Sequence, residues 1–254
     1  MVDDHNELKP EGGFRTAAEQ DAGTRLAEVF ASSSDPLEAR LDTFPRYVRR
    51  QSLTRFLALY EIFRQVLEVK GSVIECGVFR GFGLMAFAQM SAVLEPVNFT
   101  RRVYGFDTFE GFASVGERDR TAHLEVGSGV LASDSFEELR RLIEIFDANR
   151  PLGHIPKVHL VKGDATETIP RFVKEHPHLV VSLLFLDFDL YAPTKVAIEA
   201  FLPRMPKGAI LAFDELDNPL WPGETLALLD TIGISNLRLR RHPFDPYIGY
   251  AVIE

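Results

Sequence analysis

The amino-acid sequence predicts an α/β protein with a mostly parallel seven-stranded sheet, helices on both faces, a terminal antiparallel hairpin and a helical N-terminal extension. Residues 72–83, SVIECGVFRGFG, combine an apolar β-branched run, a glycine-rich turn and the start of a helical pattern. Five β-patterned runs alternate with helical patterns, which predicts a parallel sheet covered on both sides. Two further β-patterned runs at the C-terminal end have no helix between them, so they are expected to run antiparallel to each other.

The N-terminal part of the chain is predicted to form a helical extension. Residues 1–18 contain no periodic apolar pattern and are expected to be a disordered tail. Helical patterns follow at residues 22–31, 36–41 and 47–69. We therefore expect residues 19–70 to form an extension packed on a catalytic domain of residues 71–254. The sequence leaves open whether this extension covers the sheet, forms a subunit contact or closes over a ligand.

The β/α alternations follow in order. Strands are predicted around Val73 and Ile74 and at residues 102–107, 158–161, 179–186 and 209–213. Helices are predicted at residues 84–94, 135–146, 167–175, 193–202 and 222–232, with Ser135 as an N-cap and Glu138 three residues on. The terminal hairpin is predicted at residues 237–241 and 247–253. Five parallel strands completed by such a hairpin are the outline of a class I (Rossmann-like) methyltransferase rather than of a dehydrogenase.

The glycine spacing distinguishes between classes of nucleotide ligand. A dinucleotide fingerprint has the form G-x-G-x-x-G, whereas here the pattern is E-x-G-x-x-x-G-x-G, with Glu75 inside the strand. Glycines let the backbone approach a ligand closely, and the first N–H groups of the following helix are unpaired. A carboxylate would repel a pyrophosphate but suits a cationic ammonium group. S-adenosylmethionine (SAM) has such a group and is the expected cofactor.

Composition and charge argue against several classes of partner. A formal net charge of −9 disfavours nucleic acid, whose phosphates would be repelled. The one cysteine, Cys76, cannot form an internal disulfide and falls within a predicted buried strand. The longest apolar run is too short to cross a bilayer, and the polar N-terminus lacks the apolar core of a signal peptide. We expect a cytoplasmic protein that binds neither membrane nor nucleic acid.

Acidic residues lie at the carboxyl end of nearly every predicted strand, where ligands of parallel sheets gather. They are Glu75, Asp107, Asp164, Asp187 with Asp189, and Asp214 with Glu215. Crowded carboxylates repel one another unless a cation or hydrogen-bond donors lie among them. Asp107 is expected to bind the ribose hydroxyls of the cofactor. Asp164 and Ala165 are expected to face the adenine edge.

The acids after the fourth and fifth strands suggest a metal site. Asp187, Asp214 and Glu215 supply hard oxygen ligands of the kind that Mg²⁺ or Ca²⁺ prefers. No cluster of histidine and cysteine in the sequence competes for zinc.

Several segments, taken together and in order, resemble the macrocin/mycinamicin-type (TylF/MycF-like) family of sugar O-methyltransferases. They are VIECGVFRGFG, YGFDTFEGF, KGDA, FLDFDLYAPT, GAILAFDEL and WPGE, and the similarity covers roughly residues 71–223. The resemblance implies a SAM- and metal-dependent enzyme that methylates a sugar hydroxyl in antibiotic and other secondary-metabolite biosynthesis. The sugar would be carried by a nucleotide, as in a TDP-deoxyhexose, or by a glycosylated natural product.

The resemblance also assigns residues by position. It implies that the cofactor is bound by Glu75, Gly77, Arg80, Gly81, Asp107, Thr108, Phe109, Asp164 and Ala165. It implies that Asp187, Asp214 and Glu215 hold the metal. The chain departs from the family pattern at Glu215, where the family often has a second aspartate, and at Phe188, where it has a small residue.

The chemistry of the reaction explains why a metal is expected. A sugar hydroxyl is about as weak an acid as water, near pKa ~15, whereas coordination can lower the pKa of an oxygen to about 7. We expect the ion to chelate two neighbouring sugar oxygens while a carboxylate removes the proton. Asp187 is the first choice for this base, followed by Asp189 and His123. His123 lies in the irregular stretch 108–133, the candidate lid and acceptor wall, and the alternative of a surface histidine stays open.

Other functions remain open at this point. A catechol-type O-methyltransferase would use the same metal, because vicinal phenolic oxygens also bridge one. The D-x-D of LDFDL would suit a glycosyltransferase, and the glycine spacing disfavours a nicotinamide-dependent oxidoreductase. A non-catalytic SAM-binding module would have no reason to hold the three predicted metal ligands together. The helical extension makes a homo-oligomer the expected assembly.

Overall fold

The structure is a computed structural model of the chain and describes residues 16–121 and 127–254. The chain divides into two compact units, Met1–Leu57 and Ala58–Glu254. The boundary falls inside α3 (Arg50–Gln65), so the last part of the predicted extension belongs to the unit that contains the sheet.

The first unit is helical, as the apolar pattern predicts. It contains α1 (Ala17–Ser32), α2 (Leu37–Asp42), η3 (Phe44–Arg46) and the first half of α3. α1 begins earlier than predicted because Thr16 and Glu19 form a capping box, in which each side chain accepts from the other residue's backbone N–H. Residues 16–18 of the predicted tail therefore form the start of α1, and residues 1–15 lie outside the described part of the chain.

The second unit contains a seven-stranded sheet with the strand order β3-β2-β1-β4-β5-β7-β6. The strands are β1 (Ser72–Cys76), β2 (Val103–Asp107), β3 (Val158–Lys162), β4 (Val181–Leu186), β5 (Ile210–Phe213), β6 (Arg240–Arg241) and β7 (Gly249–Val252). The first five pair in parallel, and β7 pairs antiparallel with both β5 and β6. The predicted parallel sheet with a terminal antiparallel hairpin is confirmed. Strand order reverses between β1 and β4, which is where such sheets bind ligands.

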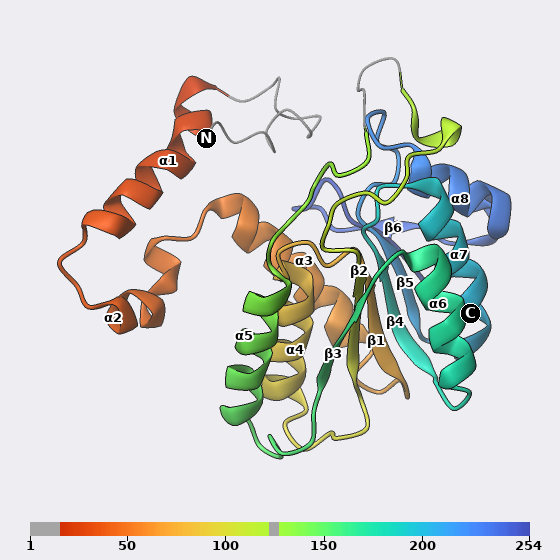
Figure 1. Ribbon diagram of the computed structural model, residues 1–254, viewed down its shortest axis with the longest axis horizontal. Coiled ribbons are helices and arrows are strands. Elements are labelled where there is room, and N and C mark those ends of the chain that lie inside the picture. The colour runs from red at the N-terminus through yellow and green to blue at the C-terminus, as the bar shows by residue number, and fades with distance from the viewer. Residues whose placement is uncertain (1–15, 122–126) are drawn as a thin grey trace. The chain divides into compact units, whose positions relative to one another are not determined.

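Helices cover both faces of this sheet (Figure 1). They are α4 (Phe82–Leu94), α5 (Phe136–Ala148), α6 (Ala165–Glu175), α7 (Tyr191–Phe201) and α8 (Gly223–Thr231), with short turns η4 (Glu117–Asp119), η5 (Leu202–Arg204) and η6 (Ile234–Asn236). α4, α5 and the second half of α3 pack on one face, and α6, α7 and α8 on the other. Alternate strand residues enter separate cores: Val73 packs in the first and Ile74 in the second.

The terminal hairpin is shorter than the sequence predicts. Asp245, which is 4% exposed, accepts hydrogen bonds from the backbone N–H groups of Tyr247 (3.0 Å) and Ile248 (2.9 Å). Because these groups are bonded within the turn, they do not join the ladder, and β7 begins only at Gly249.

The amino edge of the sheet is held by one buried arginine. Arg101 is 3% exposed and pairs with Glu95, with 2.7 Å between Nε and Oε1. Its guanidinium also donates to the carbonyls of Val66 (3.0 Å) and Gly71 (2.9 Å) and to the hydroxyl of Ser182. One side chain thereby joins the chain after α3, the start of β1, and β4.

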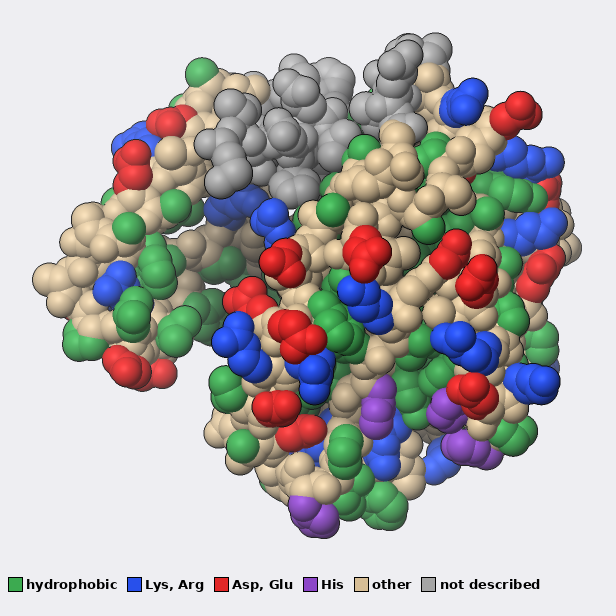
Figure 2. Space-filling model, in the orientation of Figure 1, with side chains coloured by type: hydrophobic (Ala, Val, Ile, Leu, Met, Phe, Trp, Pro, Cys, Tyr) green, Lys and Arg blue, Asp and Glu red, His purple; other side chains and the backbone are tan. Residues whose placement is uncertain are grey.

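The described part of the chain contains no helix that is long and apolar enough to cross a membrane. On the face of the second unit shown in Figure 2, acidic and basic side chains are interspersed rather than separated into large patches.

We predict that Arg101→Met lowers the free energy of unfolding by roughly 3–5 kcal/mol, because it breaks a buried ion pair and leaves several carbonyls without a donor. Chemical denaturation measures this change. Arg140 is the matched control, since it is exposed on α5 and pairs with its exposed helix neighbour Glu137, and Arg140→Met should change stability by less than about 0.5 kcal/mol. Equal losses in the two variants would contradict the role of Arg101.

Candidate active site

Backbone hydrogen bonds continue beyond the strand ends and hold the loops of the carboxyl edge together. The N–H of Asp187 donates to the carbonyl of Cys76 (2.8 Å), and the N–H of Asp214 donates to that of Leu186 (2.9 Å). The loops after β1, β4 and β5 therefore leave the sheet side by side. The structure brings the predicted acids Asp187 and Asp214 to the same edge.

Glycines allow the closest approaches at this edge. A Cβ on Gly77 would lie 1.9 Å from the carbonyl oxygen of Asp187, and the φ of Gly77 is +97°, so a larger residue does not fit. Gly81 has a φ of +84° at the N-cap of α4. Gly83 makes room for Glu75, because a Cβ there would lie 2.0 Å from Oε1 of that carboxylate. The buried Glu75 thus lies over the first turn of α4, where a negative charge is favoured.

Asp107 fixes the glycine-rich loop. Its Oδ2 accepts from the backbone N–H groups of Val78 (2.8 Å) and Phe79 (2.7 Å), and its Oδ1 accepts from that of Phe109 (2.6 Å). Ser135 reaches the same loop, since its hydroxyl donates to the carbonyl of Phe79 (2.7 Å). Ser135 is the N-cap residue of α5, as predicted, but its side chain makes no capping hydrogen bond to that helix. That Asp107 binds the ribose stays a prediction, and its carboxylate is shown to hold the loop.

Asp164 and Ala165, predicted at the adenine edge, lie at the start of α6. Asp164 is the N-cap, and its Oδ1 accepts from the backbone N–H of Thr166 (2.8 Å). Ala165 is buried and packs in the second core. Neither observation tests whether this end of β3 faces adenine.

The other residues that the resemblance assigns to the cofactor have different surroundings. Arg80 is exposed, with its guanidinium carbon 5.1 Å from the ring centre of Phe79. Phe109 is buried, and its ring packs 5.0 Å from that of Phe136. The hydroxyl of Thr108 donates to a carbonyl of its own turn. Arg80 is thus free to reach a ligand, whereas Phe109 and Thr108 shape the loop after β2.

A residue that the sequence analysis did not single out joins the loops that carry the acids. Glu224, near the start of α8, is fully buried. Its Oε1 accepts from the backbone N–H of Asp189 (3.3 Å), and its Oε2 from that of Glu215 (3.0 Å). Its place in the WPGE segment, in the first turn of an apolar helix, is the one sequence signal that could have indicated it.

Negative charge is crowded here. Burial raises the pKa of the Glu224 carboxyl well above its usual value, and the charges of Asp189, Glu215 and Asp214 raise this pKa further. Asp189, Asp214 and Glu215 are themselves buried. A cation near these loops would offset their repulsion.

The fit to a metal is partial. Carboxylate oxygens are the ligands that Mg²⁺ and Ca²⁺ prefer. However, residues 16–121 and 127–254 contain no group of three or more His, Cys, Asp or Glu side chains arranged to hold a metal ion. Glu215 Oε2 also accepts from the side-chain amide of Asn218. The predicted ligand set of Asp187, Asp214 and Glu215 therefore stays a prediction, supported by charge but not by an assembled coordination geometry.

Four loops at the carboxyl edge each contain a non-glycine residue in the left-handed region. These residues are Phe79 (φ 50°), Phe109 (58°), Asp189 (62°) and Asp217 (61°), after β1, β2, β4 and β5. Such conformations cost about 1–3 kcal/mol each and concentrate at ligand-binding sites. Their shared location supports this edge as the functional one.

The stretch 108–133, the candidate lid, is tied to the site in its described part. The N–H of Phe112 donates to the carbonyl of Val130 (3.0 Å), which closes the base of the loop. Asp119, which is 4% exposed, accepts from the N–H of Tyr191 at the start of α7 (2.6 Å). His123, the third candidate base, lies outside the described residues.

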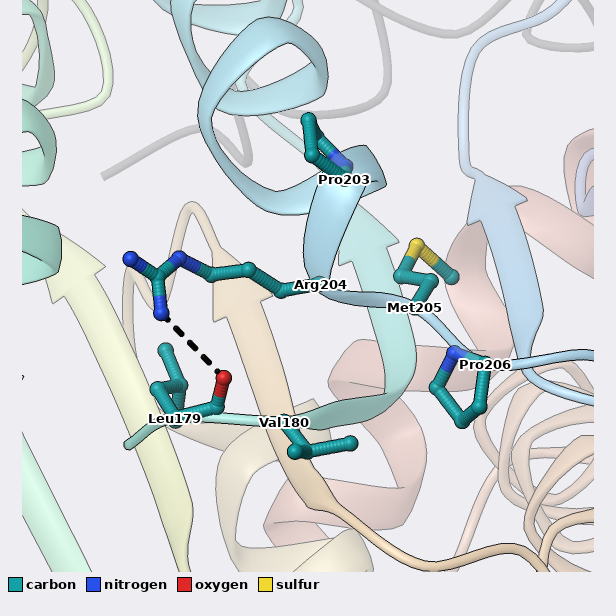
Figure 3. Close-up of a pocket in the computed structure, with 6 residues that line it drawn as sticks. All are labelled: Leu179, Val180, Pro203, Arg204, Met205 and Pro206. Carbon is teal, nitrogen blue, oxygen red and sulfur yellow. Dashed lines mark hydrogen bonds between the residues drawn. The ribbon is translucent and has the colours of Figure 1, made fainter. Parts of the chain in front are cut away.

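A surface hollow lies at the other edge of the sheet (Figure 3). Leu179 and Val180, which precede β4, line it together with residues 203–206, which precede β5. Arg204 donates to the carbonyl of Leu179 across it (3.3 Å). Because parallel sheets bind ligands at the carboxyl ends of their strands, we do not assign the catalytic site to this hollow.

We predict that Gly77→Ala lowers the free energy of unfolding by about 1–3 kcal/mol, because the added methyl group overlaps the Asp187 backbone. Gly127→Ala is the control, since a Cβ at Gly127 meets no atom of the described residues within 4 Å, and its effect should stay under about 0.5 kcal/mol. Thermal and chemical unfolding measure both. If Gly77→Ala were as stable as the control, the backbones of Gly77 and Asp187 would not lie as close in solution as they do in this structure.

Residues 48–223 match the family described as macrocin-O-methyltransferase (TylF). A curated relative from Streptomyces olivaceus is 8-demethyl-8-(2,3-dimethoxy-alpha-L-rhamnosyl)-tetracenomycin-C 4'-O-methyltransferase. It is 33% identical over 152 residues, which cover 58% of this chain and 53% of the relative. The chain thus matches about half the length of that relative.

Solved structures extend the likeness over nearly the whole chain. The crystal structure of CalS11, a calicheamicin methyltransferase, has a TM-score of 0.90 and 37% identity, covering 94% of this chain and 93% of that one. The apo structure of CalS11, named as a TDP-rhamnose 3'-O-methyltransferase, has a TM-score of 0.81 and 36% identity, covering 94% and 95%. The predicted class I methyltransferase fold is confirmed. Both the family match and this likeness show that the chain belongs to the macrocin-O-methyltransferase (TylF) family.

Proposed function

We propose that this protein transfers the methyl group of SAM to a hydroxyl of a deoxyhexose in antibiotic biosynthesis. The observation that carries the proposal is the set of buried acids on the β4 and β5 loops, next to the switch point of a methyltransferase fold. The relatives support the choice of sugar, since one is named for a rhamnosyl group and the other for TDP-rhamnose. Nucleotide-bound and natural-product-bound sugars are both kept as acceptors.

The main contribution of the chain would be alignment. Methyl transfer is an in-line displacement, and holding donor and acceptor in line can remove roughly 7–11 kcal/mol of the barrier. The donor side would be the glycine-rich loop, which Asp107 holds in place. The acceptor side would be the β4 loop, which contacts Gly77 directly. A single backbone contact would then set the geometry between the two substrates.

The proton of the sugar hydroxyl needs an acceptor, and we propose Asp187, with Asp189 and then His123 as alternatives. Asp187 is half-buried at the carboxyl edge, whereas Asp189 is almost fully buried beside Glu224. We also propose that Mg²⁺ or Ca²⁺ is held by Asp187, Asp214 and Glu215. When bound, such an ion would act as a Lewis acid and lower the pKa of the hydroxyl. The cytoplasmic location and the homo-oligomeric state stay predictions.

An acceptor assay tests the proposed function. We expect the protein with SAM to add one methyl group to TDP-rhamnose or to a rhamnosylated aglycone, with little activity on a catechol, as measured by mass spectrometry. EDTA should abolish turnover and added Mg²⁺ or Ca²⁺ should restore it. Undiminished methylation in EDTA would remove the metal from the proposal. If the protein methylated only the catechol, the acceptor would be a catechol and not a sugar.

We predict that Asp187→Asn lowers kcat by about 10²–10⁴-fold, the usual contribution of a general base, and leaves the affinity for SAM nearly unchanged. Turnover and calorimetric SAM titration measure the two quantities separately. Asp217→Asn is the matched control, because Asp217 is an exposed aspartate of the β5 loop, and it should keep wild-type turnover. Joint loss of turnover and SAM affinity in Asp187→Asn would contradict this division of roles.

A further inference from the structure

Glu224 contacts the two acid-bearing loops through their backbone. Its two carboxylate oxygens accept from the N–H of Asp189 and the N–H of Glu215, at 3.3 and 3.0 Å. Its side chain is fully buried. One shared carboxylate therefore links the backbone of the two loops that carry the acids.

The residues on either side of Glu224 hold the same two loops. A Cβ on Gly223 would lie 2.5 Å from the carbonyl oxygen of Asp189 and 2.4 Å from the nitrogen of Tyr191, so α8 begins directly against the β4 loop. On the other side, the N–H of Asp217 in the β5 loop donates to the hydroxyl of Thr225 (3.0 Å). Three consecutive residues thus connect α8 to both loops.

β4 and β5 require such a connection because their pairing ends early. The ladder joins Leu186 to Phe213, and the bond from the N–H of Asp214 to the carbonyl of Leu186 extends it by one further step. Asp189 and Glu215 lie beyond that bond. Beyond that bond, Glu224 accepts from the backbone of both loops, so its side chain ties the position of one loop to that of the other.

We propose that Glu224 is a positioning residue that sets the distance between the acids of the β4 loop and those of the β5 loop. This inference rests on the proposed function, in which the two loops together bind the acceptor and take its proton. Glu224 acts through the backbone of Asp189 and Glu215 and does not touch the substrate. A merely structural brace would change stability, whereas a positioning residue also changes turnover.

The experiment compares Glu224→Gln, Glu224→Asp and Glu224→Ala with the wild-type protein. Glu224→Ala should lower kcat by about 10²-fold, the effect of a shift of about 1 Å in a reacting group, with the affinity for SAM changed less than about twofold. Glutamine keeps the reach but only one acceptor oxygen, so it can hold one of the two loops and should recover part of the lost kcat. Aspartate keeps the charge but is one methylene shorter, and should stay low.

Asn98→Ala is the matched control. The side-chain oxygen of Asn98 also accepts from two backbone N–H groups, those of Thr100 and Arg101 (3.2 Å each), but at the amino edge of the sheet. This variant should lose stability and keep its kcat. Amide hydrogen exchange supplies a readout that needs no activity: the N–H groups of Asp189 and Glu215 should be protected in the wild type and in Asn98→Ala, and should exchange faster in Glu224→Ala.

Three results would overturn the inference: wild-type kcat in Glu224→Ala, recovery with aspartate but not with glutamine, or an equal loss of kcat in Asn98→Ala. If Glu224→Ala does not fold, the kcat values of the other two variants decide, and the inference requires that glutamine retains a higher kcat than aspartate. If the wild type methylates no acceptor, the proposed function fails, and amide exchange alone decides whether Glu224 joins the two loops. In that case, wild-type exchange rates at the amides of Asp189 and Glu215 in Glu224→Ala would show that Glu224 does not join the two loops.

Discussion

The contact between the backbone of Gly77 and that of Asp187 is the constraint on which the functional edge depends. It occurs where the strand order reverses, so the loops after β1 and β4 diverge toward opposite sides of the sheet from this point. A side chain at position 77 would separate the two loops and move everything mounted on them. The fold places a glycine there because the space between the loops is smaller than a methyl group.

Several buried or half-buried carboxylates of this protein accept hydrogen bonds from backbone N–H groups. Asp107, Asp119 and Glu224 each accept from the backbone of a neighbouring loop, and Asp245 does the same inside the terminal turn. Hydrogen bonds from backbone N–H to a carboxylate are stronger than those between neutral groups. Irregular loops are thereby held in single conformations, including ones with a positive φ, without further secondary structure. Acidic residues that resemble ligand-binding residues in sequence can therefore have a structural role, in which they hold a loop in one conformation.

The sheet could be predicted from sequence because alternation of β and helical patterns is a local signal. The parallel strands lie where expected, and the terminal hairpin is present but shorter than expected. The same alternation predicted that the acids after these strands lie at the carboxyl edge of the sheet. Glu224 could not be predicted, because the residues that it joins are separated from it in sequence and nothing local indicates its partners. Ser135 had the sequence pattern of a helix cap, but its hydroxyl bonds the loop after β1, since a tertiary partner replaced the local one.

Arg101 and the glycine-rich loop lie at opposite edges of the same sheet. The contacts that stabilise the fold are therefore separate from the loops of the candidate site. The arginine anchors strands and helix ends at a distance from any reacting group. Under the proposed function, insertions or exchanges in the segments beyond Asp187 and Asp214 would alter which hydroxyl is selected and would leave the contacts of Arg101 intact. A scaffold divided in this way can acquire a new regiochemistry by small changes at one rim.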